Sequence, residues 1–74
     1  MKKDKLLAKI DKLNQEDRCL KVVVTIVKLP SGALEVIVNT DNLNDKLNYI
    51  INAYDDDLKL KSNQDIAIVD YLIF

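Results

Sequence analysis

At 74 residues with a formal net charge of −1, the chain has room for one domain, residues 1–74, and no excess charge to attract nucleic acid or membranes. A single cysteine rules out an intrachain disulfide, and the absence of histidine leaves Cys19 without a catalytic base or zinc-binding partners. With only one glycine there is also no glycine-rich phosphate loop, so the sequence predicts neither an enzyme nor a cofactor.

The chain opens with a predicted helix over residues 2–17. Leu6, Leu7, Ile10 and Leu13 form an apolar stripe at helical spacing, with lysines around it. A helix of this length is marginal in water, so the stripe is expected to dock on another element.

Residues 19–29 predict a strand that is apolar on both faces. The face expected to pack on the core carries four residues: Leu20, Val22, Val24 and Ile26. The opposite face carries Val23 and Val27, and its cover is expected to be either the first helix or a second copy of the chain.

Pro30-Ser31-Gly32 predicts a hairpin into a return strand over residues 33–40, since proline presets one turn position and glycine accepts a positive φ. A second helix is predicted from the capping candidates at residues 40–42 to Tyr54. The last strand is predicted over residues 66–74, after a connection with a short extended piece at residues 58–60.

These elements define an α+β fold of order α-β-β-α-β. The sheet is expected to be three-stranded and mixed, in the order 2-1-3 with the first strand central, and 1-2-3 is the alternative. One helix is expected to pack on one face of the sheet, and the N-terminal helix is the second helix of the fold.

Four features could carry chemistry, and each also has a structural interpretation. Residues 55–57 are three consecutive aspartates, which suit a solvated turn better than a metal site. Asp70 interrupts an apolar strand and is expected at an edge or in an ion pair, and Cys19 is expected to be a buried, inert thiol. The lysines of the first helix predict either a solvated face or a contact with nucleic acid: Lys2, Lys3, Lys5, Lys9 and Lys12.

The segments Asn52–Leu58 (NAYDDDL) and Ile68–Tyr71 (IVDY), together with the length and element order, resemble a family of short, uncharacterised prophage proteins. This is the YopT-like family of Bacillus phage of the SPbeta type. The resemblance implies a homodimer built from a helix and a three-stranded sheet, with no known activity and no functional residues to carry over. The predicted N-terminal helix departs from the single helix of that family.

We therefore expect a cytoplasmic, homodimeric protein–protein interaction module of phage or prophage type that binds a host or phage protein. The alternative is a nucleic-acid accessory factor that uses the lysine-bearing first helix. No membrane partner is expected, because charged residues interrupt every apolar run. The expected interface is apolar: Val23, Val27, Ile37, Val69, Tyr71, Ile73 and Phe74.

Overall fold

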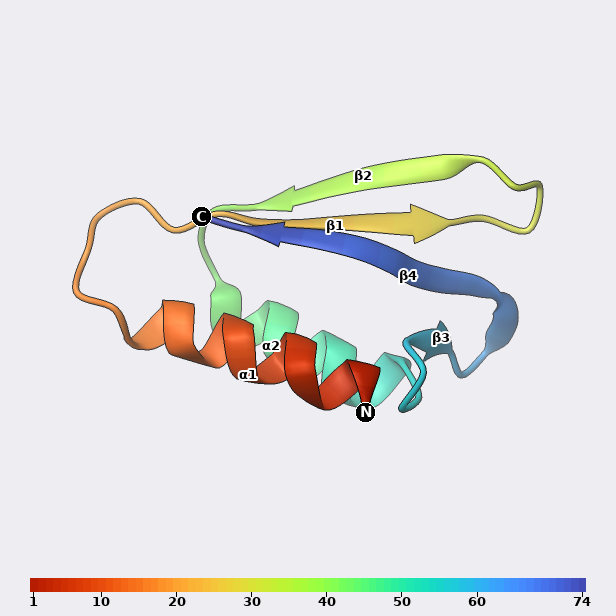
Figure 1. The fold of residues 1–74 in the computed structure, drawn as a ribbon, viewed down its shortest axis with the longest axis horizontal. Helices are drawn as coiled ribbons and strands as arrows, with labels where there is room; N and C mark the ends of the chain where they lie inside the picture. The colour runs from red at the N-terminus through yellow and green to blue at the C-terminus, as the bar shows by residue number, and fades with distance from the viewer.

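A computed structural model describes all 74 residues as two layers, with two helices on one side and an antiparallel sheet on the other (Figure 1). The elements follow one another as α1 (Lys2–Gln15), β1 (Val23–Lys28), β2 (Leu34–Asn39), α2 (Leu43–Ala53), β3 (Lys59–Leu60) and β4 (Asn63–Ile73). The predicted α+β class and both predicted helices are confirmed. Neither helix has the length and apolar content needed to cross a membrane.

The sheet has the order β2-β1-β4-β3, and every adjacent pair is antiparallel. The prediction that the first strand is central is confirmed, since β1 lies between β2 and β4. The prediction of three strands is wrong, because the two-residue strand β3 adds a fourth member beside β4. The strands β2 and β4 run parallel to each other, as the crossover through α2 predicts, but β1 lies between them and pairs antiparallel with both, so the pairing is not mixed.

The hairpin between β1 and β2 has the predicted turn. Gly32 has a φ of 90°, which a residue with a side chain rarely adopts, and its N–H donates to the carbonyl of Leu29 at 2.9 Å. The N–H of Leu29 in turn donates to the carbonyl of Ala33 at 2.8 Å. These two hydrogen bonds close the turn, so that Lys28 pairs with Leu34 at the start of the hairpin.

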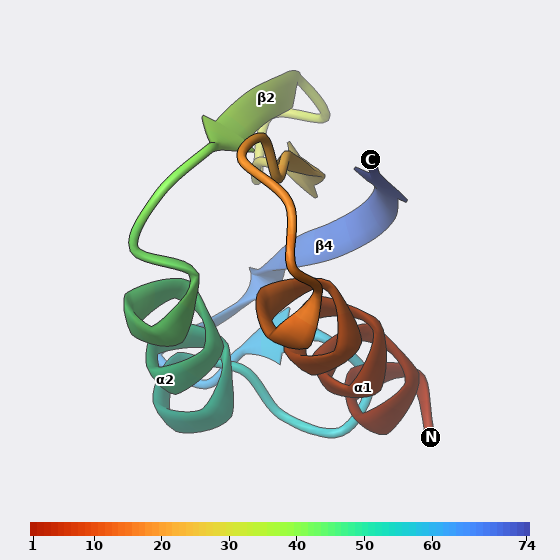
Figure 2. The ribbon, with the colours of Figure 1, turned by 90° about the vertical axis from the view of Figure 1, so that its left-hand side faces the viewer.

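Both helices lie side by side under the same face of the sheet (Figure 2). α1 contributes Leu6, Ile10 and Leu13 to the core, as its stripe predicts. α2 contributes Leu43 and Ile50, and its first residue follows Asn42 in a left-handed conformation that makes no side-chain cap. The capping hydrogen bond predicted at residues 40–42 is therefore absent.

The helices cover the face of β1 that carries Val23, Thr25 and Val27, all of which are buried. The sequence interpretation placed the core on the other face, that of Val22, Val24 and Ile26, and this assignment is wrong. Because β1 begins at Val23 and not at residue 19, the preceding segment is a loop. Cys19 is exposed in it, contrary to the expected buried thiol.

Candidate interaction surface

The sheet face turned away from the helices is apolar and has no cover. Its rows follow from the strand register: Val38, Val24 and Leu72 form one row, and Val36, Ile26 and Asp70 form the next, with the carboxylate at the β4 side. The five outer side chains of this open face have exposed fractions of 52% to 62%: Leu34, Val36, Val38, Leu72 and Phe74. Between them lie Val24 and Ile26 of β1 and Val22, the residue before β1, all three partly buried. We call these eight residues the open face.

A β-bulge in β4 decides which of its residues belong to the open face. Val27 lies opposite Ile68, whereas Ile26 lies opposite Asp70, so Val69 is the extra residue. The strict alternation assumed from the sequence fails at this point. Ile68 is buried on the helix side, and Leu72 and Phe74, which alternation placed on the same face as Ile68, turn to the open side.

The residues predicted to form an interface are divided between the two faces. Val23 and Val27 have exposed fractions of 0% and 5% and belong to the core beneath the helices. Three more are half-buried and pack against that core: Ile37, Tyr71 and Ile73. Val69 and Phe74 are exposed by 52% and 58%, the first at the bulge and the second on the open face.

Asp70 satisfies one backbone donor at the outer edge of β4. Its Oδ1 accepts a hydrogen bond from the backbone N–H of Tyr71 at 2.8 Å. Val22 and Phe74 exchange both of their backbone hydrogen bonds, and alternation along an antiparallel pair therefore turns the N–H of Tyr71 away from β1. The carboxylate thus satisfies a donor that no strand pairs with, which is the edge role that the sequence predicts.

The covered face contains a buried polar pair. The ammonium of Lys46 donates to the hydroxyl of Thr25 over 3.3 Å, and the two residues are exposed by 9% and 0%. No carboxylate forms a salt bridge with Lys46. The one ion pair in the chain joins Arg18 to Glu16. Desolvation by burial lowers the pKa of Lys46 from its ordinary 10.5. Sequence reasoning missed this pair, since Lys46 carries no signal of burial beyond its place in the helix.

The aspartates at residues 55–57 build a turn. The Oδ1 of Asp55 accepts from the backbone N–H groups of Asp57 and Lys59 at 2.9 and 3.0 Å. The hydrogen bond from the N–H of Lys59 is the main reason why the pKa of Asp55 is lowered. Leu58 adopts a φ of 63° in this turn and is buried, so the turn carries a core residue.

The lysines of α1 separate into two groups. Lys3 connects the helices: its ammonium donates to the carbonyls of Ile51 and Tyr54 at 2.8 and 2.7 Å, at the C-terminal end of α2. The others line a groove beside β4: Lys2, Lys5, Lys9 and Lys12. Of the five lysines in the predicted basic face, Lys3 therefore holds α1 to α2, and the other four lie on the surface.

Comparison of the chain with protein-family models, curated proteins and solved structures returned no match. The resemblance to the YopT-like prophage family therefore stays a prediction.

Proposed function

We propose that this chain is a homodimeric protein–protein interaction module in which the open faces of two copies pack against each other. The observation that supports it is the row structure of the open face, where eight apolar side chains from three adjacent strands lie together without cover. The phage or prophage origin implied by the family resemblance belongs to the same proposal.

The size of the open face suits a second copy. With five side chains more than half exposed and three partly buried, the open face is an apolar patch of roughly 500–600 Å² per copy, at the upper end of what a monomer leaves exposed. The largest apolar patch of an ordinary monomer is about 300–600 Å², and a standard interface buries about 800 Å² per partner. Exposed residues at the margin, such as Leu20, can supply the remaining area.

The chemistry of the open face also favours sheet-on-sheet packing. β1 and β2 present only aliphatic side chains there until Lys28, at the end of β1. Asp70 lies at the β4 side, where its carboxylate is already hydrogen-bonded to the backbone. Two such faces can approach to about 10 Å between sheets and interdigitate, as in β-sandwiches.

Sedimentation equilibrium across nanomolar to micromolar concentrations tests the proposal. We expect the wild-type chain to be a dimer at micromolar concentration and Val36→Asp to raise the dissociation constant by at least about 100-fold, because a charge would be buried without a partner. Ile51→Asp introduces the same charge at an exposed residue of α2 and is the matched control. A wild-type monomer, or equal weakening by both variants, would contradict the proposal.

A further inference from the structure

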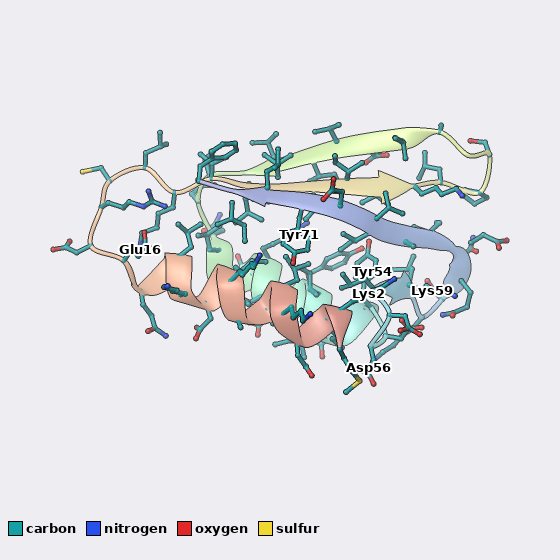
Figure 3. The ribbon with its side chains drawn as sticks, viewed as in Figure 1. Lys2, Glu16, Tyr54, Asp56, Lys59 and Tyr71 are labelled. Atoms are coloured by element: carbon teal, nitrogen blue, oxygen red, sulfur yellow. The ribbon has the colours of Figure 1, made fainter.

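A groove runs along the outer edge of β4 and borders the open face at Leu72. Two adjoining cavities of about 530 and 440 Å³ lie between α1 and β4, and Tyr71 lines both. Figure 3 shows Lys2 and Lys59 toward one end of this groove, Glu16 toward the other and Tyr71 between them. We call it the β4 groove.

The β4 groove is strongly cationic for a chain of net charge −1. Lys2, Lys5, Lys9 and Lys12 are spaced by three, four and three residues, which places them on one side of α1 along the groove. Lys28, Lys59 and Arg18 add three cations, against the four acids Glu16, Asp57, Asp65 and Asp70, and the sum is +3. Only Arg18 forms a salt bridge, so no neighbouring acid neutralises any of the six lysines.

The other wall of the groove is an open strand edge. β3 pairs with β4 only as far as Ala67, and the last backbone contact is from the N–H of Ile68 to the carbonyl of Leu58 at 2.9 Å. Beyond it, the backbone groups of Tyr71 and Ile73 point away from β1, where no further strand lies. Asp70 occupies the N–H of Tyr71, which leaves the carbonyl of Tyr71 and both groups of Ile73 for a partner.

We propose that the β4 groove binds an extended acidic peptide, which adds to the sheet as a strand along β4. Backbone hydrogen bonds to Tyr71 and Ile73 supply the register, as in other cases of strand addition to an open edge. Acidic side chains at every second position of the peptide would point toward the lysines of α1, since alternate residues of a strand share a face. α1 is about 21 Å long, which matches six residues of extended peptide.

Two observations favour a peptide over single-stranded nucleic acid. An edge of alternating N–H and C=O groups is complementary to another polypeptide backbone and not to a phosphodiester chain. The aromatic ring in the groove is half-buried, and the ammonium of Lys9 lies 5.3 Å from the centroid of Tyr71, over the ring. A base would have to displace this lysine before it could stack.

Fluorescence anisotropy with a labelled peptide of Glu at alternate positions, with Val and Thr between, tests the proposal. We expect saturable binding that weakens with salt, and Lys5→Glu/Lys9→Glu should weaken it by at least about tenfold. Lys61→Glu changes a lysine that does not line the groove and should have an effect below about twofold. Circular dichroism confirms that each variant folds.

Backbone-methylated peptides distinguish strand addition from a purely electrostatic contact. Methylating one alternate set of peptide N–H groups should abolish binding, whereas methylating the other set should leave it, because only one set faces β4. Three results would each overturn the proposal. They are equal effects of methylating the two sets of peptide N–H groups, equal effects of Lys5→Glu/Lys9→Glu and Lys61→Glu, and tighter binding of a single-stranded oligonucleotide than of the peptide. Val36→Asp should leave peptide binding unchanged, so failure here is distinguishable from failure of the dimer.

Discussion

The two faces of the sheet carry similar side chains in opposite environments. On β1, Val23 and Val27 are buried beneath the helices, whereas Val24, between them in sequence, belongs to the open face. The covered face even contains the more polar central residue, Thr25, which the ammonium of Lys46 satisfies. The comparison shows that apolar content alone does not determine which face of a small sheet receives the helices.

The connections explain why only one face is covered. α1 and α2 pack against each other, and the backbone N–H of Lys3 donates to the carbonyl of Asp56 at 3.1 Å, which joins the start of α1 to the turn after α2. Two helices connected in this way form one layer and can cover only one face. A 74-residue chain has no third helix for the other.

The largest expected effect comes from the same truncation at two adjacent residues of β1. Val23→Ala should lower the free energy of unfolding by about 2 kcal/mol, because it leaves a cavity in the core. Val24→Ala should lower it by less than about 0.5 kcal/mol when both variants are measured by urea denaturation in the Val36→Asp background, which we expect to be monomeric. Equal losses of unfolding free energy in the two variants would contradict the assignment of Val23 to the core and Val24 to the open face.

The buried polar pair gives the next effect. Thr25→Val removes the acceptor of Lys46 and should cost about 1–3 kcal/mol, whereas Thr25→Val/Lys46→Met replaces both partners by apolar groups and should recover most of that loss. Urea denaturation of these two variants, of Lys46→Met and of the wild type gives the four free energies of unfolding of a double-mutant cycle. If the double variant is as unstable as Thr25→Val, the pair does not act as a unit.

The same pair predicts a pH dependence with a definite sign. Burial lowers the pKa of Lys46 in the folded chain, so between that pKa and 10.5 the unfolded chain binds a proton that the folded chain has released. The contribution of Lys46 to stability therefore increases with pH across this window. In Lys46→Met this increase should be absent.

The smallest effect compares two neighbouring lysines. Lys3→Met removes two hydrogen bonds to the end of α2 and should cost about 1 kcal/mol, with faster amide exchange in the helix layer. Lys2→Met removes a lysine that makes no such contact and should change stability by less than about 0.5 kcal/mol. Equal effects would mean that Lys3 does not hold the layer that covers the sheet.

Much of the fold is predictable from local pattern. The hairpin follows from residues 30–32, and the central place of the first strand follows from its two apolar faces and from the polar residues of β2. Three details were not predictable because they depend on tertiary packing. They are the bulge at Val69, which reverses the facing of the residues after it, the left-handed Asn42, and the choice of covered face.

An uncovered apolar surface was predictable in kind but not in place. An excess of apolar residues over what one layer of helices can cover predicts an uncovered face. The sequence prediction places Val23, Val27 and Ile37 on that face, whereas the structure has them on the helix side. The two-sided apolar pattern of β1 is the signal for the open face, and only the helix positions show which side is open. The lysine spacing in α1 is also visible in the sequence, whereas the strand edge that faces it is not.

Isotope-filtered NOE spectroscopy on a mixture of labelled and unlabelled chains tests the proposed dimer most directly. The account predicts intermolecular NOEs among the methyl groups of Val36, Val38 and Leu72, and none from Val23 or Val27. Intermolecular NOEs confined to the helices or to the backbone edge of β2, or none from the open face at dimer-forming concentration, would contradict it.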